Sequence, residues 1–446
     1  MNFFSKQAVA LDIADYTIEA AELERKGSNI AIRSLGRSIL QPGVIKNGRI
    51  QNAKELGKAI RGTLARAKPT AIAANSIILS LPENQTYIHV AQLALHQGEE
   101  RDEYVRKEAQ KNIPLKEGDM LLSYKILSEN EEGMEVVMIA ASSEVLSEWE
   151  QFFRSMGITV AAFDAEMLAN FRGIFKEKPN HPICILDIGE SSTSIGIFDE
   201  KGIRYSYELQ GGGNWYTREI AKTLGIAEEK AEKLKRDTGL AKPEEQVFPI
   251  LVKMLEPLVK ELRSSTQYFQ EREKKDIKEI ILVGGSSRLK GIAQYIETNL
   301  SIPSKTGEAG IQGGEKAGQK REDTYLYIKA IGSALHGVTT KWNQDPVLTG
   351  EVLEEREKRN KKAGEIGGVE IFDDENVSGD TISSEETATM EQKLSKQKIT
   401  LAVILVLGVV VIAGAFWYRS NERARQQDTR ETAKVQYTQI QSFSVE

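Results

Sequence analysis

The sequence predicts an α/β protein built from two related lobes and followed by one membrane-spanning helix. Strand-like and helix-like segments alternate through roughly the first three quarters of the chain, as they do in α/β folds. A strand–turn–strand motif occurs twice within this part, which predicts two similar halves. Residues 399–418 contain no charged side chain, which predicts the membrane helix.

The composition describes a globular protein with no attraction for nucleic acid. The chain has 446 residues, enough for two or three compact units, and 40% of them are hydrophobic. Its formal net charge of -6 argues against non-specific binding to nucleic acid, so none is expected among its partners. Cys184 is the single cysteine, which rules out an intramolecular disulfide and suits a reducing compartment. Its apolar neighbours predict a small buried strand residue.

Local patterns place the strands and helices of the body. Segments rich in β-branched and apolar residues, bounded by turn residues, are predicted as strands: residues 8–13, 18–24, 77–81 and 136–141. Segments with apolar residues at helical spacing are predicted as helices: residues 56–67, 145–156, 215–224, 248–270 and 291–299. These elements belong to a body that spans residues 1–339.

An internal repeat organises this body. Residues 9–23 read VALDIADYTIEAAEL, and residues 184–198 read CILDIGESSTSIGIF. Each copy is a strand that ends in Leu-Asp-Ile, a turn of small or polar residues, and a second strand. Asp12 and Asp187 occupy the same place in the two copies. Two related lobes would bring these hairpins to opposite sides of one cleft.

The second hairpin has the chemistry of a phosphate site. Its turn holds one glycine and three hydroxyl residues: Gly189, Ser191, Ser192 and Thr193. Backbone N–H groups and hydroxyls in such a turn suit phosphate oxygens, which need many short-range donors. Asp12 and Asp187, facing each other across the phosphates, would hold Mg²⁺ through its water shell. On this motif alone, a plain β-hairpin with a polar turn is equally compatible.

Further segments support a nucleotide site. Residues 278–291 read KEIILVGGSSRLKG, a buried strand that runs into a glycine turn against which a flat ligand fits. Residues 210–213 read QGGG and precede a helix whose first N–H groups are predicted to face an anion. Glu232 and Lys235 share one helix face, either as a solvated pair or in contact with a ribose.

The order of these parts resembles the actin/Hsp70/sugar-kinase ATPase fold, and within it the subgroup of the division protein FtsA and the type IV pilus assembly protein PilM. The resemblance covers about residues 1–338, and residues 331–335 (IGSAL) are similar to the closing helix of that domain. It implies ATP and Mg²⁺ as ligands. The residues that it assigns to them are Asp12 and Thr17 in the first phosphate turn; Asp187, Gly189, Ser191, Ser192 and Thr193 in the second; Gly211, Gly212 and Gly213; Glu232 and Lys235 near ribose and base; and Gly284, Gly285 and Ser286 at the adenosine.

An insertion between the hairpins favours the same subgroup. Residues 75–164 read as two or three strands with helices, and they resemble the small subdomain that replaces the usual actin insertion in FtsA and PilM. The alternative is an unrelated α/β insertion.

The first turn departs from the family pattern, which usually reads Asp-Ile-Gly-Ser-Ser. Ala14 adds a Cβ where glycine lets the backbone approach, and Asp15 is expected to place a negative charge beside the phosphates. We therefore expect ATP binding with slow or no hydrolysis. No catalytic residue is assigned, and Asp164 and Glu166 are the candidates for a polarising carboxylate.

The C-terminal part is predicted to tether the body to a membrane. Residues 340–395 are read as a flexible acidic tether, because residues 351–391 hold thirteen acidic and five basic side chains and few large apolar ones. Residues 399–418 (ITLAVILVLGVVVIAGAFWY), at about 1.5 Å per residue, span the roughly 30 Å hydrocarbon core. The alternative of a buried core helix is disfavoured by charged flanks. Residues 419–446 form a short polar tail.

Orientation signals conflict. Lys393, Lys396 and Lys398 precede the helix, whereas four arginines follow it within a few turns, so the positive-inside rule slightly favours a cytoplasmic tail. A nucleotide-binding body without a secretory signal favours the reverse. We expect a single-pass protein of the inner membrane with its body in the cytoplasm.

Three functions compete. The first is a membrane-anchored component of the type IV pilus, or related type II secretion, assembly platform; the second is an FtsA-like division protein; the third is a small-molecule kinase. No substrate-binding signature supports a kinase. Members of the FtsA family usually attach through an amphipathic helix, whereas the layout here is similar to PilM joined to a PilN-like membrane segment, or to GspL. The resemblance implies a PilN-like inner-membrane partner and other platform proteins, and it leaves homo-oligomers open.

Overall fold

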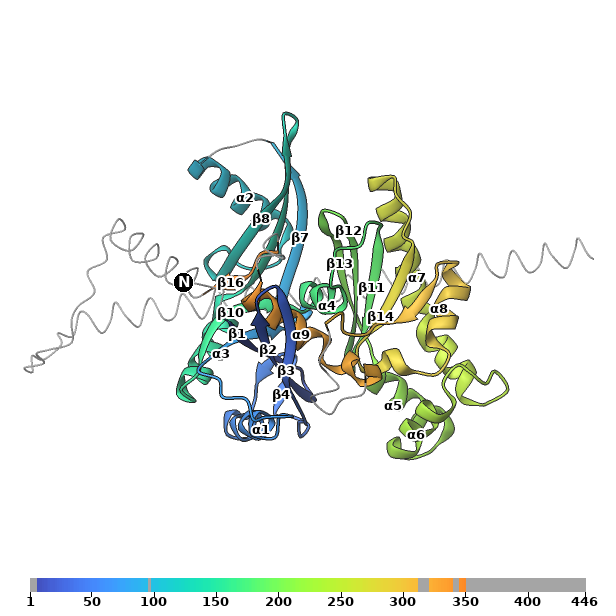
Figure 1. Cartoon of the computed structure of the whole chain (residues 1–446). Helices are drawn as coiled ribbons and strands as arrows, with labels where there is room; N and C mark the ends of the chain where they lie inside the picture. Colours follow the sequence, from blue (N-terminus) through green and yellow to red (C-terminus); the bar gives the residue numbers. More distant parts are fainter. Residues whose placement is uncertain (1–5, 95–97, 312–320, 340–344, 350–446) are drawn as a thin grey trace, which may run out of the picture. The chain divides into compact units, whose positions relative to one another are not determined.

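The computed structural model describes residues 6–94, 98–311, 321–339 and 345–349, all within one compact unit (Figure 1). Most of the predicted tether, the predicted membrane helix at 399–418 and the tail at 419–446 lie outside the described residues. No helix within the described part combines the length and the apolar character needed to cross a membrane.

Two sheets form the framework of the unit. The first has the order β16-β10-β6-β1-β2-β3 and the second has the order β13-β12-β11-β14-β15. The first sheet contains β1 (Gln7–Ile13), β2 (Thr17–Lys26), β3 (Asn29–Ile39), β6 (Ser76–Leu81), β10 (Thr159–Ala165) and β16 (Leu348–Thr349). The second contains β11 (Ile183–Ile188), β12 (Ser192–Asp199), β13 (Gly202–Gln210), β14 (Glu279–Val283) and β15 (Ser304–Thr306).

The predicted duplication is confirmed in the topology. In each sheet an antiparallel three-stranded meander is followed by two parallel strands: β1-β2-β3 then β6 and β10, and β11-β12-β13 then β14 and β15. Asp12 pairs with Glu19 across the first hairpin, and Asp187 pairs with Ser194 across the second. Each aspartate is therefore the penultimate residue of its strand, and the two copies share one register.

Helices cover the sheets, and two of them lie between the sheets in Figure 1. The α-helices are α1 (Ala53–Ala65), α2 (Gly98–Asn112), α3 (Ser143–Ser155), α4 (Glu166–Ile174), α5 (Gly213–Leu224), α6 (Glu228–Thr238), α7 (Val247–Glu273), α8 (Ile292–Leu300) and α9 (Ile328–Val338). The central pair is α4 and α9, and α9 also packs on β1 and β2. The Phe171 ring of α4 stacks on Phe198 of β12 at 4.3 Å, which joins the central helices to the second sheet.

Backbone contact between α4 and α9 depends on glycine. A Cβ added at Gly332 of α9 would come against the Ala169 carbonyl group, with its carbon only 2.6 Å away. A Cβ at Gly173 of α4 would lie 2.9 Å from Ile328 Cγ2. Both distances are too short for real atoms, so the helices approach this closely only because neither position carries a side chain.

The predicted strands and helices of the body are confirmed, and their ends differ from the prediction by no more than three residues. Continuous apolar runs identify the central strands because helices bury both faces; every residue of β11 is buried. Cys184 of this strand is buried, as predicted, and burial raises the pKa of its thiol to about 12.

The insertion is narrower than predicted. β6 and β10, at its two ends, pair with each other in the first sheet and so belong to the main body. The separate part is a three-stranded sheet of order β7-β9-β8 with α2, formed by β7 (Thr86–Leu93), β8 (Met120–Asn130) and β9 (Gly133–Ser142). β7 is not among the predicted strands, because its polar His89 and Gln92 interrupt the apolar pattern.

The body also extends further than predicted. The tether is expected to begin at residue 340, but β16 pairs antiparallel with β10 at the edge of the first sheet. Asp345, just before β16, accepts a hydrogen bond of 2.6 Å from Arg172, whose side chain is fully buried in α4. Residues 345–349 are therefore held against the body.

Candidate functional site

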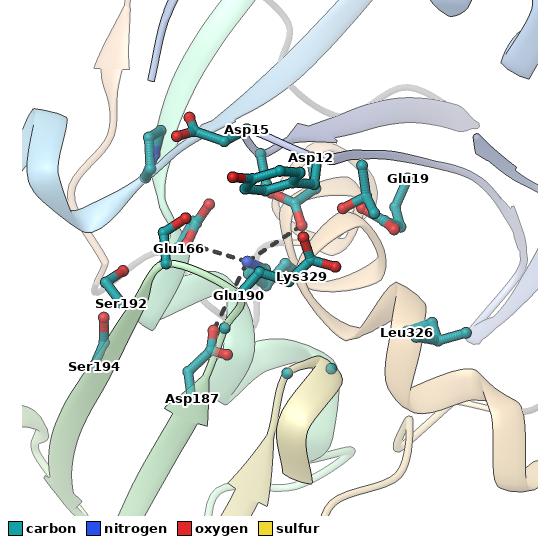
Figure 2. A pocket seen from close by; sticks show the side chains of 18 of the residues that line it. Asp12, Asp15, Glu19, Glu166, Asp187, Glu190, Ser192, Ser194, Leu326 and Lys329 are labelled. Atoms are coloured by element: carbon teal, nitrogen blue, oxygen red, sulfur yellow. Dashed lines mark hydrogen bonds and ion pairs between the residues drawn. The ribbon is translucent and has the colours of Figure 1, made fainter. Parts of the chain in front are cut away.

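The two hairpins meet at an inner cavity of about 140 Å³ (Figure 2). Asp12 and Asp187, at the ends of β1 and β11, both line it. The six other predicted residues on its wall are Thr17, Gly189, Ser191, Ser192, Gly284 and Gly285. The structure thus brings together both aspartates, both turns and the glycine turn after β14, which are distant in the chain.

Lys329 of α9 stands among three carboxylates in this cavity, as Figure 2 shows. Its Nζ lies 3.1 Å from Glu166 Oε2, 3.4 Å from Asp12 Oδ2 and 3.8 Å from Asp187 Oδ2. The three partners come from α4, β1 and β11, so one ammonium links the central helices to both hairpins.

Burial sets the protonation of these groups. It raises the pKa of Asp12 to about 6 against the attraction of Lys329, and it raises the pKa of Glu166 to about 8. Glu19, opposite Asp12, has its pKa raised to about 7 by burial, against Arg37. Burial alone would lower the pKa of Lys329, but the surrounding carboxylates raise it well above its usual range. The ammonium is therefore charged at neutral pH.

Four residues that line the cavity have a buried side-chain oxygen without a hydrogen-bond partner among the described residues: Asp12 Oδ1, Asn84 Oδ1, Glu166 Oε1 and Asp187 Oδ1. Buried polar atoms are nearly always paired in folded proteins, because an unpaired one loses its hydration without compensation. The unpaired atoms therefore indicate that a ligand or solvent normally completes this site.

The glycine turn after β14 is shaped by its contact with the second hairpin. Gly284 has φ of 80°, and a Cβ there would come against Asp187 Oδ1 and lie 2.6 Å from the Ile188 carbonyl oxygen. Only glycine fits this position. The sequence Val-Gly-Gly-Ser-Ser thus places its backbone directly beside Asp187. Gly284, which the resemblance assigns to the adenosine, lines the inner cavity and not the outer one described below.

A larger outer cavity of about 670 Å³ adjoins the inner one. The two share Arg37, Glu190, Gly285, Tyr325 and Leu326 on their walls. The outer volume lies in the range of small-molecule sites, whereas the inner one is smaller. The predicted residues on the outer wall are Gly213, Glu232, Lys235, Gly285 and Ser286.

Glu232 and Lys235 form a pair on the wall of this outer cavity. Lys235 Nζ lies 2.7 Å from Glu232 Oε2 and donates hydrogen bonds of 2.8 Å to the Gly213 carbonyl and to Thr217 Oγ1. The lysine side chain is only 8% exposed, so the pair is more than a solvated surface contact. It fixes α6 to the start of α5 beside the cavity.

The start of α5 does not offer N–H groups to an anion, so that prediction is wrong. Gly213 N donates to the Gly189 carbonyl, and Asn214 N donates to the Glu190 carbonyl, both at 2.9 Å. These carbonyls belong to the second hairpin turn and already use the donors. Gly211 and Gly212 line neither cavity; they join the turn to the helix.

Thr193 faces away from the cavity. Its Oγ1 donates to the Gly211 carbonyl at 2.8 Å, and its side chain lines neither cavity. Because side chains alternate along a strand and β12 begins at Ser192, Ser192 and Ser194 face the cleft instead. The sequence reading includes Thr193 in the turn and so misses Ser194.

Asp15 lines the inner cavity, and a neighbouring turn holds its carboxylate. Its carboxylate accepts hydrogen bonds of 2.9 Å from Asn47 N and 3.1 Å from Gly48 N, in the turn between β4 (Ile45–Lys46) and β5 (Arg49–Ile50). Figure 2 shows it apart from the group around Lys329. These hydrogen bonds fix the position of the carboxylate but leave its negative charge on the cavity wall. Ala14 lines the same cavity.

The two candidates for a polarising carboxylate have different surroundings. Glu166 lines the inner cavity, whereas Asp164 is fully buried outside it, paired with Arg172 and with Ser333 Oγ at 2.7 Å. Asp164 is thus a structural residue. Within the part of the chain that the structure describes, no group of three or more acidic, histidine or cysteine side chains has an arrangement that holds a metal ion.

The sequence reading misses Lys329, Glu19, Arg37 and Asn170. Asn170 Nδ2 donates to Asp187 Oδ2 at 2.8 Å, and Arg37 Nε donates to Glu19 Oε1 at 2.7 Å. The sequence does contain a feature that could have predicted Lys329. It is the one charged residue in the mainly apolar segment 328–335 (IKAIGSAL), which forms the first part of α9. A charge on such a helix needs a buried partner.

Comparisons with known proteins concern the fold as a whole. Residues 10–338 match a family model described as type IV pilus assembly protein PilM. A solved structure of a PilM-PilN type IV pilus biogenesis complex is similar in fold, with a TM-score of 0.64 and 23% identity over 74% of this chain and 98% of that chain. The predicted actin-like α/β fold of the PilM group is confirmed.

Curated relatives include two cell division proteins. The chain is 23% identical over 248 residues to FtsA of Neisseria meningitidis serogroup B, covering 50% of this chain and 58% of that protein. It is 27% identical over 181 residues to FtsA of Pseudomonas aeruginosa, covering 35% and 43%. The chain thus spans about half the length of these relatives.

Proposed function

This chain belongs to the type IV pilus assembly protein PilM family, and from that premise we propose that it is a nucleotide-binding component of the pilus assembly platform at the inner membrane. The observation that carries the nucleotide part is the convergence of Asp12, Asp187 and the Gly284 turn on one cavity between two equivalent hairpins. A related type II secretion platform is the alternative setting, and the proposed nucleotide site would be the same there.

In this proposal ATP spans both cavities. Its phosphates lie in the inner cavity against the turn that holds Ser191 and Ser192, and its adenosine lies in the outer cavity beside Ser286 and the Glu232–Lys235 pair. The ligand contacts both lobes, so it acts by holding them in one arrangement. Turnover is slow or absent, because Ala14 stands where a glycine would let the backbone approach the phosphates.

Filling the passage between the cavities tests this placement. Gly285 lines both of them, its φ is not positive, and a Cβ there would meet no atom within 4 Å. Gly285→Phe should therefore fold normally but lose ATP binding by at least about tenfold, since the ring occupies ligand space. Calorimetric titration of the purified full chain with ATP measures the effect. Gly118→Phe, at another open glycine, is the control. Equal affinities of Gly285→Phe and wild type would place the nucleotide elsewhere.

The partner proposed is a PilN-like inner-membrane protein. Support comes from the similar solved structure, which is described as a PilM-PilN complex. We propose further that residues 399–418 anchor this chain in the same membrane, which would keep the two proteins together in the plane of the bilayer. Other platform proteins and copies of this chain are further candidates for contact.

Cysteine labelling tests the orientation. We expect Ser442→Cys to react with a membrane-impermeant thiol reagent on intact cells, and Ser383→Cys to react only after lysis. We expect little background labelling of the native cysteine, because Cys184 is buried and the pKa of its thiol is raised to about 12. Labelling at 383 but not at 442 on intact cells would reverse the topology.

A division role is the second candidate, because the curated relatives are FtsA proteins. Deletion of the gene separates the two. Cells that divide normally but lack surface pili support the assembly role, and undivided filaments support the division role.

A further inference from the structure

A positive side chain stands where the sequence predicts a divalent cation. Asp12 and Asp187 are the two carboxylates expected to share Mg²⁺, and Lys329 Nζ is within 4 Å of an oxygen of each. In Figure 2 the lysine reaches from α9 into the space between the two strand ends. The ammonium therefore occupies the position midway between the lobes.

The carboxylates do not fit Mg²⁺ in this arrangement. That ion needs near-octahedral oxygen ligands, usually several of them water, and the ammonium takes up the space between Asp12 Oδ2 and Asp187 Oδ2. A divalent ion placed there would lie a few ångströms from a charged lysine in a poorly solvated cavity, where like charges repel strongly.

Lys329 keeps hydrogen-bonding capacity for a ligand. An ammonium has three N–H donors, but the described residues provide one hydrogen bond, to Glu166 Oε2 at 3.1 Å. The contacts with Asp12 and Asp187 are longer ion pairs of 3.4 and 3.8 Å. The side chain is 21% exposed and lines the inner cavity. A phosphate oxygen in the cavity can therefore accept from the remaining donors.

We propose that Lys329 is the counter-cation of the nucleotide site, so that this chain binds the phosphates of ATP without a divalent metal ion. The inference rests on the nucleotide-binding function proposed above. The carboxylates have the role of holding the ammonium: Asp12 and Asp187 fix it from the two lobes, and Glu166 fixes it from α4. Lys329 is thus a binding residue, and the aspartates are positioning residues.

A purely structural role for Lys329 makes a different prediction. If the lysine only joined the lobes, its loss would lower stability and would leave the metal requirement for ATP unchanged. The metal dependence of binding is therefore the readout that separates the two roles.

The experiment compares ATP titrations of the full chain in excess EDTA and in excess Mg²⁺ at fixed ionic strength. Wild type should bind equally well in both. Lys329→Met, which keeps an unbranched side chain one atom shorter, should lose about tenfold or more of its affinity in EDTA, because a charge-assisted hydrogen bond is removed. Mg²⁺ should restore part of that loss, since the vacated space between the aspartates then admits a cation. Lys329→Arg should retain binding in EDTA.

Lys235→Met is the matched control, because Lys235 lies on the outer cavity and its loss should weaken binding equally in EDTA and in Mg²⁺. Wild type that binds ATP only with Mg²⁺ would overturn the inference and leave the proposed function intact. Wild type that binds under neither condition would overturn both. If Lys329→Met fails to fold, the wild-type comparison in EDTA and Mg²⁺ still decides.

Discussion

Gly332→Val should prevent the body from folding. A Cβ at this position would meet the Ala169 carbonyl group of α4, and backbone atoms cannot move aside as a flexible side chain does. Lys329 belongs to α9, as Gly332 does. Moving α9 away from α4 would therefore also move Lys329 away from Glu166 and the other carboxylates around it. We expect a loss of at least about 4 kcal/mol in the free energy of unfolding, which exceeds the effect of most substitutions.

Soluble yield and denaturant unfolding of the full chain, followed by tryptophan fluorescence, measure this effect. Trp149, buried in α3, reports on the first lobe. Gly118→Val is the matched control, because a Cβ there would meet nothing within 4 Å. A Gly332→Val protein that unfolds at the wild-type denaturant concentration would show that the two helices do not touch as described.

Arg172→Met should cost about 3 to 5 kcal/mol, the range observed when one member of a buried ion pair is removed. Arg172 is fully buried and donates to Asp164, to Asp345 and to the Gly332 carbonyl. Its loss leaves the Asp164 carboxylate buried with Ser333 as its remaining donor among the described residues. The buried carboxylate then has no opposite charge beside it, which costs more free energy than the loss of the contact itself.

A double variant separates these two contributions. Arg172→Met combined with Asp164→Leu should recover part of the stability, because no buried charge remains. Asp345→Asn should have a smaller effect than Arg172→Met, since Arg172 keeps Asp164 as its partner. Denaturant unfolding of the three variants provides the comparison. An Arg172→Met protein within about 0.5 kcal/mol of wild type would mean that the pair is hydrated in solution.

The sequence predicts those parts of the site that rest on local patterns. Asp12 and Asp187 are predicted as site residues because they occupy the same place in the two copies of the sequence repeat. In the structure the two hairpins pair in the same register, which places both aspartates at equivalent positions. Gly284 is found because only glycine tolerates its backbone conformation beside Asp187. In each case the physical requirement is contained in a few consecutive residues.

Other parts depend on residues that are far apart in the chain. The position of Lys329 in the site depends on its contacts with Asp12, Glu166 and Asp187. All three lie more than 100 residues away in the sequence, so no short segment predicts these contacts. The donors at the start of α5 look free in the sequence because the carbonyls that use them belong to the turn before β12. The prediction that the tether begins at residue 340 is wrong at Asp345 for the same reason. Its partner Arg172 is buried and distant in the sequence, so the composition around Asp345 does not reveal the ion pair.

The contact of residues 345–349 with the body has a mechanical consequence. Tension on the chain beyond residue 349 is transmitted first to β16, which must peel from β10, and to the Asp345–Arg172 pair. Only after these yield does the load reach α9 and the lysine between the lobes. A pulling force on the C-terminal side would thus act first at the edge of the first sheet. The cleft would keep its geometry as long as the force is too weak to separate β16 from β10 and Asp345 from Arg172.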